Sequence, residues 1–208
     1  MSRENIFKNG GCSSVAAVVL AAGMSRRMGE PKMILPWGET TVIGQVVQIL
    51  QQAGIAEIVV VTGSDREMVE VALKGSGVRI EFNEKYQEDH MLLSLNTGIR
   101  HLSKETNAAL VVLGDQPQIL TEVVRSLISH YCLNKSWLTV PSFNNRRGHP
   151  WLIDQRLWSE LLMLTPPLTL RQWLQRHSTD IEYLEVHTDS ILKDLDTPVD
   201  YLRETSGE

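Results

Sequence analysis

The residues best suited to chemistry lie in a short segment near the start of the chain. An apolar run at 15–21 passes into small residues around Gly23, and Arg26, Arg27 and Lys32 follow soon after. Small residues let backbone N–H groups approach phosphoryl oxygens, and fixed cations strengthen the resulting hydrogen bonds. This combination predicts a phosphate cradle whose ligand is a nucleoside triphosphate.

The spacing within this segment excludes two common phosphate-binding motifs. Gly23 and Gly29 stand six positions apart, whereas dinucleotide-binding and P-loop motifs require other spacings. Residues 20–32 instead match L-A-A-G-x-S-x-R-M-G-x-x-K, which resembles the signature of molybdenum cofactor cytidylyltransferases and their guanylyltransferase relatives. The resemblance implies catalytic roles for Arg26 and Lys32. It implies nucleotide binding by Leu20, Ala21, Ala22, Gly23, Ser25, Arg27 and Gly29.

A carboxylate follows the most apolar segment of the chain, at 108–113. The run Gly114-Asp115-Gln116-Pro117 places Asp115 at the carboxyl edge of the expected sheet, beside the first segment. Its oxygens suit Mg²⁺, which usually takes one or two carboxylates together with substrate phosphates. We therefore expect Asp115 to be a catalytic metal ligand. The alternative is that it only shapes the turn before Pro117.

Two further carboxylates lie near the end of the chain. The run from Asp194 to Tyr201 resembles the D-x-D-T-P-x-D-Y segment of the same family. In an extended segment, Asp194 and Asp196 point the same way, so either is a candidate to complete the Mg²⁺ shell. The alternative is that Asp196 or Thr197 caps a helix beginning at Pro198, and both interpretations can hold together.

The acceptor side is suggested by Arg146-Arg147-Gly148-His149-Pro150, which resembles the family's R-x-G-H-P segment. Arg147 or His149 is expected to bind the phosphate monoester of a pterin substrate, because arginine offers a bidentate fork and histidine a switchable donor. A solvated hairpin carrying two surface arginines is the alternative.

Three polar residues are expected near the nucleotide base. Thr62 and Asn83 end predicted strands, so they lie on the ligand-binding edge of the sheet, although a simple Asn turn would also explain Asn83. Ser94 lies in a segment that resembles the family's G-M-x-x-S-L-x-x-G. Here His90 replaces the usual glycine and Leu93 a small polar residue, and Pro166-Pro167 replaces part of a later family segment. These departures motivate an alternative function, a non-catalytic carrier of a finished nucleotide-linked cofactor, whereas the retention of Arg26, Lys32 and Asp115 argues against it.

Strands and helices alternate along the chain, which predicts a three-layer α/β/α, Rossmann-like fold with a mostly parallel sheet. By resemblance it is of the nucleotide-diphospho-sugar transferase type. Predicted strands cover 15–21, 57–62, 78–82, 108–113, 138–143, about 149–153 and 181–186. Predicted helices cover 42–53, 65–74, 91–102, 121–133 with Thr121 as its cap, 155–164 and 169–177. Residues 1–13 are expected to form a flexible leader and 14–208 a single domain.

The composition bounds the class of protein. Twenty Lys and Arg against twenty-five Asp and Glu give a net charge of −5, so nucleic acid is not an expected partner. The sequence contains no apolar stretch long enough to span a bilayer. The two cysteines are too few for a disulfide framework, and we expect a soluble cytoplasmic protein.

The resemblance implies a Mg²⁺-dependent nucleotidyltransferase. The expected reaction is transfer of CMP from CTP to molybdenum-loaded molybdopterin, because Ala22 is typical of the cytidylyl branch. Guanylyl transfer from GTP to the same cofactor, or transfer to another small phosphate, is the alternative within the enzyme class. An apo-molybdoenzyme that receives the product is a further expected partner.

Overall fold

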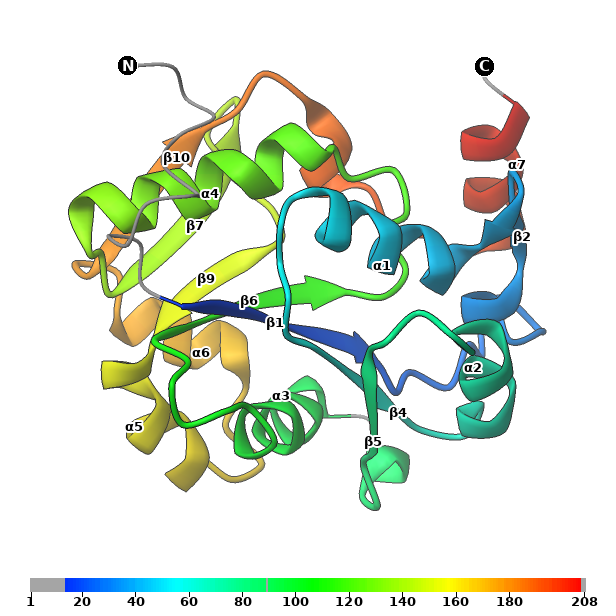
Figure 1. Cartoon of the computed structure of the whole chain (residues 1–208), viewed down its shortest axis with the longest axis horizontal. Helices are drawn as coiled ribbons and strands as arrows, with labels where there is room; N and C mark the ends of the chain where they lie inside the picture. Colours follow the sequence, from blue (N-terminus) through cyan, green and yellow to red (C-terminus); the bar gives the residue numbers. More distant parts are fainter. Residues whose placement is uncertain (1–13, 89, 207–208) are drawn as a thin grey trace.

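The computed structural model describes residues 14–88 and 90–206 of the chain (Figure 1). The predicted leader at 1–13, which includes Cys12, therefore lies outside the described residues. Alternating strands and helices build one large mixed sheet between two layers of helices, and a short two-stranded hairpin lies beside it. The mostly parallel three-layer architecture predicted from the sequence is confirmed.

The order of strands places β1 near the centre of the large sheet. The order is β10-β7-β9-β6-β1-β4-β5, with β8 paired to β7. The strands are β1 (Val15–Ala21), β4 (Ile58–Thr62), β5 (Arg79–Phe82), β6 (Ala108–Leu113), β7 (Leu138–Phe143), β8 (Arg146–Arg147), β9 (Trp151–Asp154) and β10 (Ile181–Glu185). Strand β1 runs parallel to both β4 and β6, whereas β9 is antiparallel to β6 and β7. The carboxyl ends of β1 and β6 therefore meet at one edge.

The two faces of the sheet are covered by different helices (Figure 1). The helices are α1 (Val42–Gln52), α2 (Arg66–Ala72), α3 (Met91–Arg100), α4 (Thr121–Asn134), α5 (Trp158–Met163), α6 (Leu170–Arg176) and α7 (Pro198–Ser206). Along β1, Val19 packs into the core under α1, α2 and α4, and the next residue, Leu20, packs into the core under α3, α5 and α6. This period of two is what a strand buried on both faces requires.

Helix α3 approaches β1 closely because Gly98 faces Val18. A Cβ added at Gly98 would overlap the Val18 side chain, so only glycine allows this separation. The contact brings the start of α3, which carries Met91 and Ser94, close to the end of β1. Packing in the sheet centre therefore positions one wall of the site described below.

Several boundaries differ from the prediction. Thr121 does not cap α4: the cap position is Leu120, and the Thr121 hydroxyl instead donates to Gln52 Oε1 at 3.3 Å. The predicted helix at 155–164 divides into the 3₁₀ turn η4 (Gln155–Leu157) and α5. The prediction of Thr169 as the start of a helix is confirmed by its capping box with Gln172.

Short elements between the main ones were not predicted. They are the 3₁₀ turns η2 (Lys32–Ile34), η3 (Tyr86–Glu88) and η5 (Asp189–Leu192), and the hairpin of β2 (Pro36–Trp37) and β3 (Thr40–Thr41). Elements of two to four residues are too short to show a hydrophobic period, so the pattern along the chain does not reveal them.

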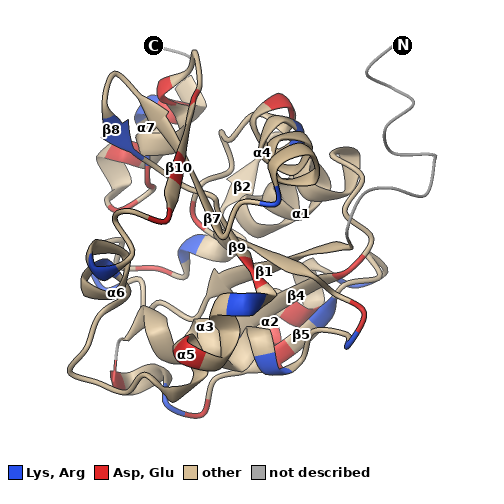
Figure 2. Cartoon of the chain, turned by 90° about the vertical axis from the view of Figure 1, so that its left-hand side faces the viewer, with Lys and Arg blue, Asp and Glu red and all other residues tan. Residues whose placement is uncertain are grey.

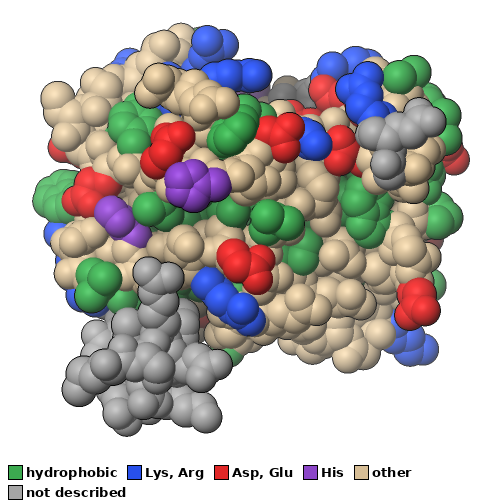
Figure 3. All heavy atoms as spheres, turned by 90° about the horizontal axis from the view of Figure 1, so that it is seen from above, with side chains coloured by type: hydrophobic (Ala, Val, Ile, Leu, Met, Phe, Trp, Pro, Cys, Tyr) green, Lys and Arg blue, Asp and Glu red, His purple; other side chains and the backbone are tan. Residues whose placement is uncertain are grey.

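Charged residues are interspersed along the chain. Lys and Arg stand among Asp and Glu over the elements visible in Figure 2. Seen from above, hydrophobic side chains also lie among charged ones (Figure 3). Among the described residues, none of the helices has the length and apolar character needed to cross a bilayer.

A polar cluster joins α5 to the end of α6. His177 contacts Glu160 through Nε2 at 2.9 Å and Asp180 through Nδ1 at 2.8 Å. Trp173 donates its indole N–H to the other oxygen of Glu160 at 3.0 Å. Burial lowers the pKa of His177, but the hydrogen bonds to Asp180 and Glu160 outweigh it and leave this pKa raised.

The raised pKa predicts that His177 stabilises the fold most at low pH. A histidine whose pKa is higher in the folded than in the unfolded protein contributes its full stabilisation of the fold below the unfolded pKa, about 6.5. That stabilisation is lost as pH rises through the higher folded pKa. Urea unfolding of the wild type and of His177→Gln should give a larger difference in the free energy of unfolding at about pH 5.5 than at about pH 9. An equal difference at both pH values would contradict this assignment.

Candidate active site

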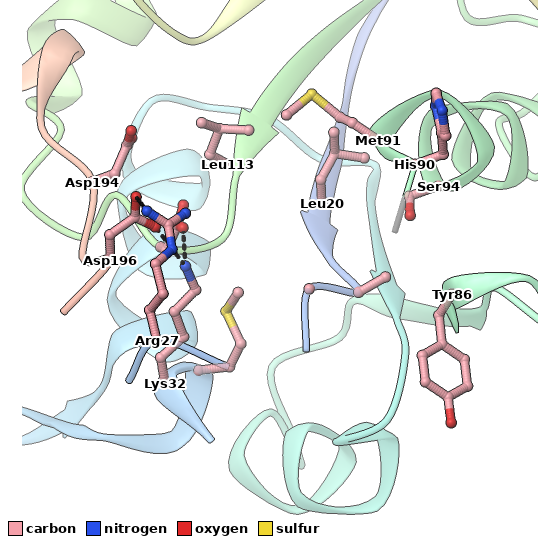
Figure 4. Close-up of a pocket in the computed structure, with 14 residues that line it drawn as sticks. Leu20, Arg27, Lys32, Tyr86, His90, Met91, Ser94, Leu113, Asp194 and Asp196 are labelled. Atoms are coloured by element: carbon pink, nitrogen blue, oxygen red, sulfur yellow. Dashed lines mark hydrogen bonds and ion pairs between the residues drawn. The ribbon is translucent and has the colours of Figure 1, made fainter. Parts of the chain in front are cut away.

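A pocket of about 340 Å³ opens at the carboxyl ends of β1 and β6. Its lining combines cations, carboxylates, apolar groups and ring side chains: Leu20, Ala22, Gly23, Arg27, Lys32, Met33, Tyr86, His90, Met91, Ser94, Leu113, Asp115, Asp194 and Asp196. Figure 4 shows the charged residues on one side and Tyr86, His90 and Ser94 on the other. The volume suits a small ligand with one charged and one less polar part.

The charged side of the pocket contains a network of ion pairs. Lys32 Nζ pairs with Asp115 Oδ2 and lies 3.6 Å from Asp196 Oδ1. Arg27 Nη1 lies 2.9 Å from the other carboxylate oxygen, Asp196 Oδ2. The side chains of Lys32 and Asp115 are only 10% and 16% exposed, whereas that of Arg27 is 72% exposed. Lys32 is therefore the sheltered cation of the site and Arg27 a cation at its rim.

The loop after β1 is folded so that it presents backbone donors. Met28 N–H and Gly29 N–H both donate to the carbonyl of Ser25, and Lys32 N–H donates to Ser25 Oγ. Ser25 and Gly29 have positive φ angles of 49° and 79°. Within the described residues, the N–H groups of 23–27 donate to no protein acceptor. The loop thus keeps a run of donors available, as a phosphate cradle requires.

The C-terminal segment lies against Asp115. Leu195 N–H donates to the Asp115 carbonyl at 3.1 Å, and the Leu195 side chain is fully buried in a small cluster with Met28, Leu35 and Val42. Asp194 and Asp196, on either side of Leu195, both line the pocket. A buried leucine between two carboxylates therefore directs this segment toward the first loop.

The same segment also begins α7, as the alternative interpretation proposed. Asp200 N–H donates to Thr197 Oγ1, and the Asp200 carboxylate accepts from the N–H and hydroxyl of Thr197. Pro198 is the first residue of the helix. The capping residue is thus Thr197, which leaves the Asp196 carboxylate to face Arg27 and Lys32.

Asp194 differs from the other carboxylates in its surroundings. Gln116 Nε2 donates to Asp194 Oδ1 at 2.7 Å. Desolvation and the negative charge of nearby Asp115 raise the pKa of Asp194. A carboxyl beside like charges is stabilised by an added cation, which reverses this repulsion.

These carboxylates fit a divalent cation whose shell is completed by a ligand. Asp115 and Asp196 already converge on one positive group, Lys32 Nζ, and carboxylate oxygens are the donors that Mg²⁺ prefers. Among the described residues, however, the side chains do not form a group of three or more suited to hold a metal. A metal here would therefore also need phosphate oxygens or water, which is the usual situation for Mg²⁺.

The less polar side of the pocket includes residues that the sequence analysis did not assign to it. Tyr86 lines it, as do His90 and Met91 at the start of α3, and the pocket lining also includes Met33 and Leu113. His90 was visible in the sequence only as a departure from the family's glycine. Tyr86 lies in the short turn η3, which no periodic pattern marks.

Among the three residues predicted near the base, only Ser94 lines the pocket. Asn83 Nδ2 donates to Ser94 Oγ at 3.1 Å, and Asn83 Oδ1 accepts from Lys85 N–H at 3.0 Å. Asn83 is buried and thus supports the turn and Ser94. Thr62 is fully buried and donates to the carbonyl of Glu81. The structure gives both residues internal contacts outside the pocket lining.

Other predicted residues also lie outside the pocket lining. Arg26 is exposed and its guanidinium contacts Met24 Sδ at 3.4 Å. Ala21 is buried in the core, and Ser25 and Gly29 shape the loop. Arg147 is exposed on β8. Their predicted ligand contacts remain predictions.

The segment at Gly148 and His149 supports the chain that leads to Asp194. His149 N–H donates to the Ile191 carbonyl at 3.1 Å, and a Cβ added at Gly148 would overlap that same carbonyl oxygen. The His149 ring stacks on Trp151 with centroids 4.3 Å apart. Burial lowers the pKa of His149 to about 4, so its imidazole is neutral at pH 7. Its enclosed Nε2 has no partner within the described residues.

A family model for the MobA-like NTP transferase domain matches residues 17–181. Because this match covers well over half of the chain, the chain belongs to that family. The protein is a nucleotidyltransferase, which agrees with the cations, donors and carboxylates of the pocket.

Several named relatives are similar over much of the chain. Molybdenum cofactor cytidylyltransferase of Escherichia coli (strain K12) is 27% identical over 91% of this chain and 95% of its own. A probable molybdenum cofactor guanylyltransferase of Bacillus mycoides (strain KBAB4) is 30% identical over 65% of each chain. Nicotine blue oxidoreductase of Paenarthrobacter nicotinovorans is 28% identical over 88% of this chain and 92% of its own.

Solved structures share the fold. Rv0371c of Mycobacterium tuberculosis H37Rv has a TM-score of 0.82 at 27% identity, covering 94% of this chain and 99% of its own. Its complex with manganese has a TM-score of 0.78 at 26% identity, covering 94% of this chain and 100% of its own. CMP:2-keto-3-deoxy-manno-octonic acid synthetase has a TM-score of 0.75 at 18% identity, covering 93% and 98%, and confirms the predicted nucleotide-diphospho-sugar transferase fold.

The close approach at Gly148 predicts that a single added methyl group is destabilising. Gly148→Ala must displace the Ile191 backbone, and overpacking of this kind costs about 1–3 kcal/mol. Gly23→Ala is the matched control, because a Cβ there meets no atom within 4 Å. Thermal unfolding should show a lower transition temperature for Gly148→Ala and little change for Gly23→Ala. Equal changes in the transition temperature of the two variants would contradict this role of the close contact between Gly148 and the Ile191 backbone.

Proposed function

We propose that this nucleotidyltransferase transfers CMP from CTP to the phosphate of molybdenum-loaded molybdopterin with the help of Mg²⁺. The phosphate monoester oxygen forms a bond to the α-phosphorus of CTP. The bond from that phosphorus to the oxygen bridging to the β-phosphorus breaks, and pyrophosphate leaves with the electron pair. The observation that carries the proposal is the meeting of Lys32, Arg27 and two aspartates beside a loop of available N–H groups.

The loop after β1 is suited to the triphosphate. The guanidinium of Arg27 lies at the open rim, where a polyanion can approach, and among the described residues the backbone donors at 23–27 have no protein acceptor. Lys32, held at the start of η2, lies deeper and can reach the transferring and leaving phosphates. Catalysis in this class depends on positioning and charge neutralisation, and Lys32 and Arg27 are the cations of the pocket that can supply both to a bound triphosphate.

No protein base is needed to activate the acceptor. A phosphate monoester has a second pKa near ~6, so at neutral pH it is already mostly a dianion. A divalent cation held by Asp115 and Asp196 would supply positive charge for the phosphoryl oxygens. The protein's own part is to orient the two anionic substrates and to offset their repulsion with Lys32 and Arg27.

The choice of base and acceptor rests on similarity. The relative that covers 91% of this chain is named as a cytidylyltransferase acting on molybdenum cofactor, and Ala22 matches the cytidylyl form of the first motif. The guanylyltransferase relative is similar over a smaller share, 65%. Tyr86, His90 and Met91 form the wall available to the base or the pterin.

Pyrophosphate release identifies the substrates directly. With Mg²⁺, we expect release from CTP, and not from GTP, ATP or UTP, only when molybdenum-loaded molybdopterin is present. A preference for GTP would leave the mechanism of nucleotidyl transfer unchanged and would identify guanine, not cytosine, as the base that the protein recognises. Tight binding of the nucleotide-linked cofactor without release from any nucleotide would instead favour the carrier function.

Removal of one charge tests the role of Asp115. Asp115→Asn keeps the size of the side chain but removes a charge from the centre of the network, so turnover should fall by about 10²-fold or more. Asp65→Asn is the control, because Asp65 contacts Ser64 and lies outside the pocket lining. Circular dichroism should show that both variants are folded. Near-normal pyrophosphate release by folded Asp115→Asn would refute the mechanism.

A further inference from the structure

The carboxylates that suit a divalent cation already bind cations of the protein. One oxygen of Asp115 pairs with Lys32 Nζ, and the two oxygens of Asp196 face Lys32 and Arg27 at 3.6 and 2.9 Å. The Lys32 and Asp115 side chains are both largely sheltered from water. The same oxygens therefore cannot be fully available to Lys32 and to a metal at the same time.

A divalent cation added to this arrangement would meet strong repulsion. An ammonium and a metal ion sharing one carboxylate lie only a few ångströms apart, and two unit charges at 4 Å repel by about 4 kcal/mol near a protein surface. Moving Lys32 away requires another anion for its ammonium, because an unpaired sheltered charge is costly. A triphosphate in the cradle after β1 is such an anion, and Arg27 is placed to bind it at the rim.

We propose that Lys32 occupies the metal's carboxylates until the triphosphate draws its ammonium away. Lys32 is then a positioning residue for the metal as well as a ligand of the nucleotide. The metal then binds well only when the nucleotide is also bound. The nucleotide-free protein has a low affinity for the metal. This inference rests on the proposed function for the identity of the triphosphate, but the exchange of cations concerns Lys32, Asp115 and Asp196 alone.

Manganese binding without nucleotide tests the proposal. Electron paramagnetic resonance measures the concentration of free Mn²⁺ during titrations of the wild type and of Lys32→Met. The substitution removes the ammonium but keeps an unbranched side chain. Since a neighbouring opposite charge changes a carboxylate's affinity for a proton by about 10- to 1000-fold, Lys32→Met should bind Mn²⁺ at least ~10-fold more tightly than the wild type. Equal or weaker binding by folded Lys32→Met overturns the proposal.

A matched variant separates competition from a general loss of positive charge. Lys193 precedes Asp194 in the chain, but its ammonium pairs with Asp189 and Glu204, at 3.5 and 3.3 Å. Lys193→Met should therefore change Mn²⁺ affinity less than ~2-fold, on the scale of screened surface charges. A gain equal to that of Lys32→Met overturns the proposal. Adding Asp115→Asn to Lys32→Met should remove the gain, because both ions compete for Asp115.

The wild type provides a second measurement that does not depend on the variants. When the nucleotide-free protein, labelled with ¹⁵N-lysine, is titrated with Mg²⁺, the ammonium resonance of Lys32 should move over the same range of Mg²⁺ concentration that saturates the carboxylates. An unchanged resonance with metal bound overturns the proposal. None of these titrations requires turnover or an acceptor, so failure of the pyrophosphate assay and failure of the cation exchange are separate results.

Discussion

The ion pair between Lys32 and Asp115 is the interaction on which the site depends, because it joins two segments, distant in sequence, that follow the central strands β1 and β6. Lys32 follows β1 and Asp115 follows β6, and these strands are paired in parallel with Leu20 opposite Leu113. A sheltered charge is tolerated only beside its partner. Each residue therefore fixes the place of the other, and the loop after β1 is held against the turn after β6.

The C-terminal segment adds the third part of this arrangement. Leu195 is buried against the first loop and its N–H donates to the Asp115 carbonyl, so Asp196 is brought to Lys32 and Arg27. Ile191, just before this segment, rests on Gly148 and His149. The R-x-G-H-P segment thus has a structural role that is independent of any contact with an acceptor.

Several residues show how local and long-range information differ. Asn83 was expected near the base because it ends a strand, but its amide is used by Lys85 and Ser94 and it faces the protein interior. The spacing of residues along a strand places an amide at the correct edge of the sheet. It does not say which neighbours will satisfy that amide, because one of them, Ser94, comes from α3 and is brought to Asn83 only by the fold.

The sequence by itself determined the α/β alternation, the central buried strands and the cation-rich loop, since hydrophobic period and small-residue spacing are local properties of the chain. Its family motifs also indicated the class of reaction. Only the tertiary structure decided that Lys32 shares Asp115 and Asp196 and that Tyr86 and His90 lie across the pocket from them. These contacts join residues that are far apart in the sequence. They form only because the order of the strands and the connections between them bring those residues to one edge of the sheet.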